Sequence, residues 1–379
     1  MMKKMILIAF GCCMTVISNI LAQNRNPVIE SLVAEQRTGT FLVDIRYDVS
    51  DPENDMLFVY VEVSRDSGKT FTVPAKSFSG NYGFPILPGK DKLIVWDAGI
   101  DYPEQYGESF RVRLIASDLK LDRVVSIPAD SFLMGDIDGL FDQKPPHTVR
   151  LNEFNIAPYA VTNAEYKIYC DLTHRAYPPE GGASQAPIGY FLNYPNYPVV
   201  GVSWYDAVRY CNWLSQQYGF NACYDTTNWS YNPSKNGFHL PTEAQWERAA
   251  RGGLATKKYP WGDEDPGTRC NYQSYQGVLV DSMAHFSNNR GPLPVGKFQP
   301  NGFGLYDMAG NVFEWCNDWY QEDYYSISPS QNPLGPSSGT ERVIRGGAWN
   351  RAEAELRCAF REKKAPNTKR YDLGFRIAR

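Results

Sequence analysis

The N-terminal third of the chain alternates between apolar and polar positions with the period of two that a half-buried β-strand produces. Every odd position of residues 41–49 (FLVDIRYDV) and of residues 57–63 (LFVYVEV) is apolar, and the intervening DPEND at 51–55 has turn composition. Two more strands are predicted at 92–98 (KLIVWDA) and 110–118 (FRVRLIASD). This third of the chain is therefore predicted to be all-β.

Short strands with a turn about every ten residues are typical of a β-sandwich of the immunoglobulin or fibronectin type. We predict such a domain over residues 24–118. No catalytic constellation occurs in it, so we expect a binding or spacer role. Residues 119–125 join it to the rest of the chain.

From residue 127 onward the pattern changes, and tryptophan, tyrosine, glycine and proline become frequent. Three short helices are predicted from capping boxes whose N-caps are Thr162, Ser203 and Thr242. The third helix should end at Gly252. Glycines and prolines punctuate nearly every other window, so loops and short strands should make up the remainder.

The first 22 residues have the pattern of a signal peptide. Two lysines precede an apolar stretch at 5–21, and Ala22 ends a suitable cleavage site. The stretch is shorter than a membrane-spanning helix requires. We expect export to the periplasm, the outer surface or the medium; a lipid anchor at Cys12 or Cys13 is the alternative, although few apolar residues precede these cysteines.

The charge pattern excludes several partner classes. The 379 residues carry a formal net charge of −4, and loss of the two signal-peptide lysines makes the mature chain more negative. Neither a basic patch for nucleic acid nor a basic amphipathic helix for a membrane surface is present. We expect no transmembrane segment in the mature chain. Four scattered histidines give little support to a histidine-based metal site or catalytic triad.

Six cysteines follow the signal segment, an even number that permits disulfides with fifteen possible connectivities. They are Cys170, Cys211, Cys223, Cys270, Cys316 and Cys358. None forms a CxxC pair, so a structural zinc site is not expected.

An ordered series of motifs runs through residues 127–379. It includes FLMGD, HLPTEAQWERAARGG, YPWGDE, GLYDMAGNVFEW, RVIRGGAW and a final LGFR. This series strongly resembles the formylglycine-generating enzyme family, also called the sulfatase-modifying factor family. The resemblance implies an α+β fold that is an irregular relative of the C-type lectin fold with little secondary structure. With a β-sandwich in front, the chain is similar to secreted multidomain members from Bacteroidetes-like bacteria.

Active members of that family oxidise a sulfatase cysteine to formylglycine, using copper held by two thiolates in a C-x4-C spacing after an RGGS-aromatic motif. The matching positions here are Arg351 and Leu356, and Ala348 stands where the family has its active-site serine. The resemblance therefore implies no catalytic residues and no bound copper.

The resemblance also implies that the family disulfides are lost. Cys358 and Cys211 match structural cysteines of the family, whose partner positions hold Ala250 and Ile377 here. Two other disulfides are then possible, one between Cys211 and Cys223 and one between Cys316 and Cys358. Buried free thiols are one alternative. A relocated copper site made of Cys316 and Cys358 is another.

Calcium is the ligand that the resemblance favours most. The family binds it around the turn before its tryptophan-rich strand, and a hard cation prefers such carboxylate and carbonyl oxygens. The matching residues are Asp307, the carbonyls of Gly310 and Val312, and Glu314. A second, less complete set comprises Asn271, Tyr272 and Asn289, with Ser287 where an acid is expected. Alternatively, the two acids of the first set only cap the turn.

Three functions follow from this pattern. The first is a non-catalytic role in binding or in cell-envelope and surface assembly, with an unknown protein or glycan as partner. The second is a formylglycine-generating oxidoreductase with a divergent site. The third, weaker one is lectin-like carbohydrate binding, which rests on fold analogy.

Overall fold

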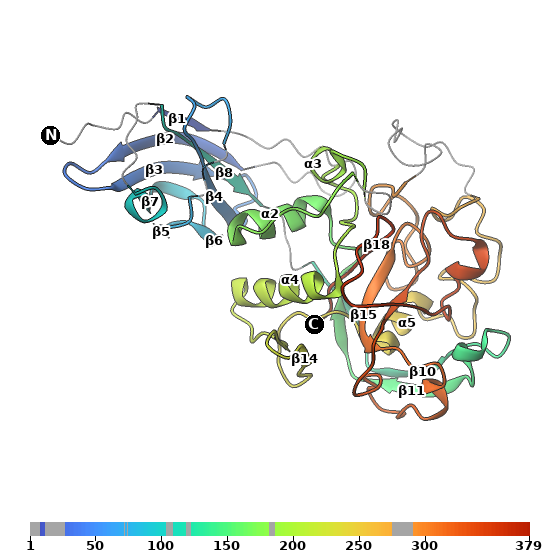
Figure 1. The fold of residues 1–379 in the computed structure, drawn as a ribbon. Coiled ribbons are helices and arrows are strands. Elements are labelled where there is room, and N and C mark those ends of the chain that lie inside the picture. The colour runs from blue at the N-terminus through green and yellow to red at the C-terminus, as the bar shows by residue number, and fades with distance from the viewer. Residues whose placement is uncertain are drawn as a thin grey trace. The chain divides into compact units, whose positions relative to one another are not determined.

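The computed structural model describes residues 8–11, 27–71, 73, 75–103, 109–118, 123–181, 186–274 and 291–379. The chain divides into two compact units. The first comprises residues 1–120 with 170–176, and the second comprises residues 121–169 with 177–379. Figure 1 shows the helices and strands of the two units, and each unit has a hydrophobic core of its own.

The first unit contains two four-stranded sheets, with strand orders β1-β8-β4-β6 and β2-β3-β7-β5. The strands and the one-turn helix are β1 (Ile8–Gly11), β2 (Val28–Gln36), β3 (Leu42–Ser50), β4 (Leu57–Ser64), β5 (Phe78–Gly80), β6 (Gly83–Ile86), β7 (Gly89–Asp97), α1 (Ala98–Asp101) and β8 (Arg111–Ser117). Both sheets contribute side chains to one core, so they pack face to face. The predicted β character of this segment is confirmed.

The alternation along β3 and β4 has the predicted phase, because their odd-numbered apolar side chains are buried in the core. Strand β4 differs from the prediction on its other face. Phe58 and Tyr60 are buried there as well, and the ring of Phe84 stacks on Phe58 at 4.3 Å between centroids. Successive side chains of β4 therefore point to opposite faces of the strand as predicted, but the residues on both faces are buried.

Strand β1 lies inside the predicted signal peptide and pairs in parallel with β8. The other residues of that segment, and residues 119–122 of the predicted linker, lie outside the described residues. The signal-peptide prediction therefore stays a prediction. Among the described residues, no helix is both long enough and apolar enough to span a membrane.

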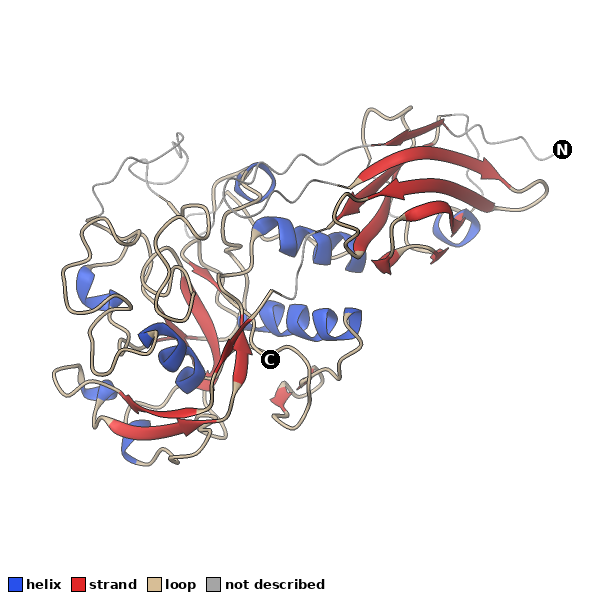
Figure 2. Cartoon of the chain, turned by 180° about the vertical axis from the view of Figure 1, so that it is seen from behind, coloured by secondary structure: helices blue, strands red, loops and turns tan. Residues whose placement is uncertain are grey.

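The second unit combines short helices and strands with long loops, which Figure 2 shows in tan, and this confirms the α+β class. Its strands are β9 (Val125–Ile127), β10 (Asp130–Met134), β11 (His147–Leu151), β12 (Phe154–Ile156), β13 (Tyr224–Asp225), β14 (Ser230–Tyr231), β15 (Phe313–Trp319), β16 (Arg342–Arg345), β17 (Glu362–Lys364) and β18 (Leu373–Gly374). Its helices are α2 (Asn163–Thr173), whose residues from Cys170 onward are assigned to the first unit, α3 (Tyr190–Asn193), α4 (Trp204–Gln217) and α5 (Glu243–Arg251). Its 3₁₀ turns are η1 (Phe141–Gln143), η3 (Tyr324–Ser326) and η4 (Glu353–Leu356).

The three predicted helices form where their capping boxes place them. Ser203 caps α4 and Thr242 caps α5, each with a complete reciprocal box. Thr162 caps α2, since its hydroxyl accepts from the Glu165 amide at 3.2 Å and its own amide donates to the Glu165 carboxylate at 2.7 Å. Gly252 ends α5 in the left-handed conformation, with φ of 58°. These predictions are confirmed.

The largest sheet of the second unit has the order β17-β16-β15-β18. Strand β15 carries the FEWCNDW segment, β16 carries RVIR and β18 begins LGFR. Three motifs that are separated in the sequence therefore become neighbouring strands. Helix α5 contacts β15 and β16, and Trp246, which is fully buried, belongs to the core between them.

Candidate functional site

The segment from Asp307 to Glu314 forms a tight turn that leads into β15. Asp307, Gly310 and Asn311 have positive φ angles of 55°, 78° and 62°. A Cβ atom at Gly310 would lie only 2.2 Å from the backbone oxygen of Asn271. Since both the φ angle and the close approach disfavour a side chain, glycine is required at this position.

The side chain of Asn311 fastens this turn to a distant segment. Its Oδ1 accepts a hydrogen bond from the Leu293 amide at 2.8 Å, and its Nδ2 donates to the Leu293 carbonyl at 3.1 Å. The Asn311 amide donates to the Asn271 carbonyl at 2.8 Å. Tertiary contacts therefore determine the shape of the turn.

Asp307, the first predicted calcium ligand, has a carboxylate that is only partly satisfied. Its Oδ2 accepts from the Gly296 amide at 2.8 Å, whereas its buried Oδ1 has no hydrogen-bond partner among the described residues. Burial raises the pKa of Asp307 to about 6, and the nearby Glu314 carboxylate acts in the same direction. An unpaired buried carboxylate oxygen at a tight turn fits the preference of calcium.

Glu314, the other predicted acidic ligand, is engaged in a buried ion pair. Arg376 donates from Nε to Oε2 at 2.6 Å and from Nη2 to Oε1 at 2.7 Å, and the Trp246 indole donates to Oε2 at 2.7 Å. Both Glu314 and Arg376 are almost completely buried. Because a guanidinium already neutralises this carboxylate, Asp307 is the acid of the turn that keeps a free oxygen.

The second predicted calcium set is described only in part. Asn271 is buried, and its Nδ2 donates to the Gly291 carbonyl at 2.9 Å and to Asn311 Oδ1 at 3.3 Å. Tyr272 packs in an apolar cluster with Leu293. Asn289 and Ser287 lie outside the described residues.

The two positions that match the copper thiolates have different surroundings. Arg351 donates from Nη2 to Oδ2 of the fully buried Asp372 at 3.2 Å, and its guanidinium lies 5.3 Å from the centroid of the Phe313 ring. Leu356 is fully buried in the apolar cluster that includes Tyr259. Ala348, at the position of the family serine, is also fully buried.

Cys211, Cys223, Cys316 and Cys358 are buried free thiols, so neither predicted disulfide is present. Burial raises the pKa of Cys316 well above its usual range and raises that of Cys358 to about 12. A relocated copper site needs thiolates, and burial in apolar surroundings disfavours the thiolate form. Among the described residues, no group of three or more His, Cys, Asp or Glu side chains is arranged to hold a metal ion.

Sequence reasoning missed a network of buried charges beneath these motifs. Glu243 and Glu247, one turn apart on α5, pair with three arginines, and all five residues are buried. Arg345 pairs with both glutamates, Arg251 donates to Glu247 at 2.7 Å, and Arg361 donates to both oxygens of Glu243 at 2.7 and 2.8 Å. The sequence did contain a sign of this network, because α5 carries two glutamates at positions i and i+4 among apolar residues.

Asp318 lies at the edge of this network. Its Oδ2 accepts from the Glu243 amide at 2.9 Å. Burial raises the pKa of Asp318 to about 8, and the negative charge of Glu243 adds to the shift. Burial therefore favours the protonated form of this carboxyl group in the folded protein, and Asp318 is not exposed to solvent.

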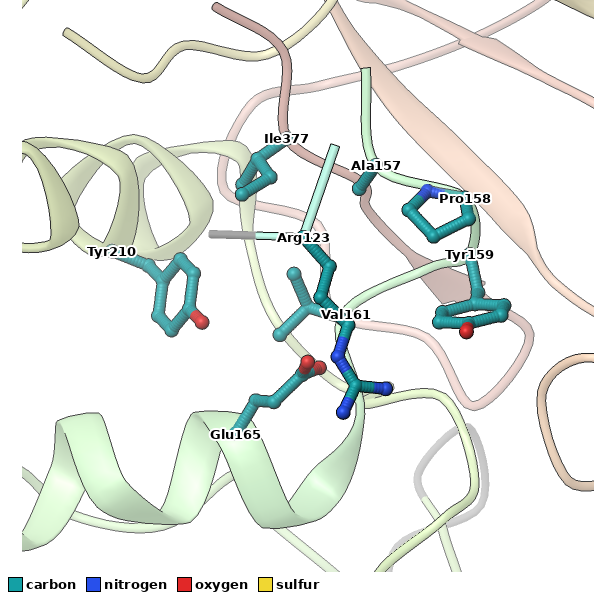
Figure 3. A pocket seen from close by; sticks show the side chains of 8 residues that line it. All are labelled: Arg123, Ala157, Pro158, Tyr159, Val161, Glu165, Tyr210 and Ile377. Carbon is teal, nitrogen blue, oxygen red and sulfur yellow. The ribbon is translucent and has the colours of Figure 1, made fainter. Parts of the chain in front are cut away.

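A cavity of about 10 Å³ lies beside α2, and Figure 3 shows the side chains that line it. The carboxylate of Glu165 and the hydroxyl of Tyr210 point into it from two helices. The Glu165 carboxylate accepts from both the amide and the hydroxyl of Thr162, at 2.7 and 2.9 Å. This volume suits one water molecule, so the cavity has no room for a substrate.

Comparison with known proteins identifies the family of this chain. The model of the sulfatase-modifying factor enzyme 1-like domain matches residues 113–379. The chain belongs to this family. The match contains the turn, the α5 helix and the strands that carry the buried arginines.

Two relatives and one solved structure are similar to this chain over about two thirds of its length. The formylglycine-generating enzyme of Streptomyces coelicolor is 34% identical over 300 residues, which cover 67% of this chain and 88% of that protein. A Chlamydia pneumoniae protein named serine/threonine-protein kinase pkn1 is 35% identical over 272 residues, which cover 68% of this chain and 38% of that protein. Treponema denticola variable protein 1 is similar in structure, with a TM-score of 0.55 and 28% identity over 67% of this chain and 94% of its own.

The turn allows a test with a matched pair of glycines. Gly310 and Gly304 have the same φ of 78°, but a Cβ at Gly304 meets no atom within 4 Å. We expect Gly304→Ala to lower the free energy of unfolding by about 1 kcal/mol, and Gly310→Ala by at least about 2 kcal/mol more because of the clash with Asn271. Urea denaturation of both variants measures the difference, and equal losses would contradict the proposed close approach.

Asp318 should give the stability a pH dependence. Its folded pKa of about 8 lies above the ordinary value of 3.8, so its contribution to stability falls as the pH rises between these values. Relative to the wild type, Asp318→Asn should gain up to about 1 kcal/mol per pH unit through that range. Denaturant midpoints measured from pH 5 to 8 check this, with the exposed Glu322→Gln as control. A constant difference between Asp318→Asn and the wild type would rule the shift out.

Proposed function

We propose that this chain is an exported, non-catalytic member of the sulfatase-modifying factor family with a binding or surface-assembly role at the cell envelope. The main support is the residue at the first copper position. Arg351 brings a permanent positive charge to that position and pairs it with Asp372. A guanidinium repels a copper ion, while a thiolate would bind it.

The second copper position supports the same proposal. Leu356 is packed among aromatic and aliphatic side chains and offers no ligand atom. Since Ala348 also lacks the family hydroxyl, none of the three matching positions has the side chain that the oxidation uses. The two relatives named above differ in the activity that their names give, although each matches about two thirds of this chain.

We assign the first unit the supporting role of a spacer or adhesion module of the immunoglobulin or fibronectin type. Its two packed sheets agree with that class, and strands β2 to β8 would remain in them after β1 leaves with the signal peptide. The predicted signal peptide would send the chain out of the cytoplasm. Modules of this type commonly act outside the cytoplasm. The partner in this proposal is an envelope protein or glycan.

The same proposal includes a calcium ion that the protein binds in a structural role. Asp307 Oδ1 would be its acidic ligand, and the carbonyl oxygens of Gly310 and Val312 would be further ligands. The unpaired buried oxygen of Asp307 supports this assignment. Glu314 would not bind the ion itself but would position Arg376. Arg376 donates to the Tyr306 carbonyl at 3.0 Å and so stabilises the backbone next to Asp307.

The alternative function, a formylglycine-generating oxidoreductase with a divergent site, is tested directly. Purified full-length protein is incubated with a CxPxR peptide, Cu(I) and O₂, next to a known formylglycine-generating enzyme as positive control. We expect no conversion of the peptide cysteine by mass spectrometry. Any conversion that the wild-type chain catalyses above the copper-only background would overturn the non-catalytic proposal.

A gain-of-function variant makes this test sharper. The double substitution Arg351→Cys with Leu356→Cys regenerates the C-x4-C spacing. Competition with a chromogenic chelator should show at least about tenfold tighter Cu(I) binding by this variant than by the wild type. Single substitutions at each position serve as controls, because one thiolate alone should not reach the affinity of the pair.

Calcium should raise the melting temperature of the wild-type protein after treatment with a chelator. At 100 times the dissociation constant, the stabilisation is about 2.7 kcal/mol. Asp307→Asn should lose most of this shift, whereas Asp138→Asn, which changes an exposed acid, should keep it. An identical calcium response in Asp307→Asn would exclude Asp307 as a ligand.

A further inference from the structure

An open hollow of about 460 Å³ lies on the second unit beside the YPWGDE segment. It is lined by Leu254, Lys257, Trp261, Gly262, Asp263 and Glu264. This volume falls in the range that small-ligand sites occupy. None of the lining residues belongs to the turn at Asp307 or to the positions that match the copper site.

Trp261 is held rigidly at this hollow. It sits in a turn closed by two backbone hydrogen bonds between Tyr259 and Gly262, at 2.9 and 3.1 Å. Its indole N–H donates to the Glu264 carbonyl at 2.9 Å. The buried Tyr259 ring stacks against it at 5.1 Å and 15°. One face of the half-buried indole is thus packed on protein, and its orientation is set before any ligand arrives.

The support under this platform continues into the buried part of the unit. The Tyr259 hydroxyl donates to Glu353 at 2.8 Å. Arg251 of the buried charge network donates to the Lys257 carbonyl at 3.2 Å, and the Cys358 amide donates to the Lys258 carbonyl at 2.7 Å. Three hydrogen bonds therefore attach this loop to the rest of the unit, and such attachment lowers the entropy lost on binding.

The charges around the hollow compensate one another. Lys257 Nζ lies 2.6 Å from Asp263 Oδ2, and both side chains are about half exposed. The Lys258 amide donates to Asp263 Oδ1 at 3.1 Å, and Glu264 lies 3.7 Å from Arg269. The rim therefore offers hydrogen-bond donors and acceptors without a net charge that would select a phosphate or a multivalent cation.

We propose that this hollow is a carbohydrate-binding site for a neutral sugar. A pyranose ring has a face of C–H groups that can stack on the indole of Trp261, and a rim of hydroxyls that can both donate and accept. Lys257 would donate to these hydroxyls, and the carboxylates of Asp263 and Glu264 would accept from them. This inference gives a ligand class to the binding role proposed above and rests on that role.

The test uses the full-length protein and isothermal titration with four neutral probes. These are unbranched tetrasaccharides of β-linked glucose, α-linked mannose, β-linked galactose and N-acetylglucosamine. We expect at least one to bind with a dissociation constant of about 1 mM or lower. Trp261→Ala should weaken that binding at least about tenfold. Trp229→Ala, which removes a half-buried tryptophan outside the hollow, should leave it unchanged.

Asp263→Asn provides a second variant that keeps the aromatic platform. It should weaken binding about threefold to tenfold without changing the near-ultraviolet circular dichroism, so loss of affinity is separated from unfolding. Absence of binding to all four probes, or equal binding by the wild type and by both hollow variants, would overturn the inference. Such a result would leave the outcome of the copper and peptide assay unaffected, so failure of the sugar site and failure of the non-catalytic proposal are distinguished.

Discussion

Two carboxylates that lie away from water, Glu243 and Glu247, place the strongest constraint on the second unit. Burial of a charge is expensive unless an opposite charge and hydrogen bonds compensate it. The compensation comes from three segments, since Arg251 belongs to the same helix, Arg345 to β16 and Arg361 to the chain before β17. Removing one partner would leave an uncompensated buried charge, at a cost of about 3–5 kcal/mol. These segments must therefore fold together.

This constraint explains how a unit with long loops reaches one defined structure. The family motifs supply the charged groups: α5 supplies the glutamates, RVIRGG supplies Arg345, and LGFR supplies Arg376 for Glu314. None of these residues is one of the positions that match the copper thiolates. A chain can therefore keep the scaffold and change those positions, and Arg351 and Leu356 fit into their surroundings without disturbing the network.

The turn before β15 separates two acids that look equivalent in the sequence. Asp307 and Glu314 both match calcium ligands, yet Arg376 neutralises Glu314, and Asp307 keeps an unpaired oxygen. The same principle governs the hollow at Trp261, where the lining charges Lys257, Asp263 and Glu264 each have a partner of opposite charge. In both places, the kind of ligand that can bind depends on which charged side chains are already neutralised by a neighbour.

The sequence by itself determined the elements whose causes are local. Alternation in residues 41–49 predicted a strand, and side-chain capping at Ser203 and Thr242 predicted two helix starts, because such signals act within a few residues. The ordered motifs likewise identified the family. Tertiary structure alone decided the partner of Glu314, which is 62 residues away in the chain, and the absence of a disulfide between Cys316 and Cys358. Ion pairing and burial depend on which distant segments meet, and no local pattern records that.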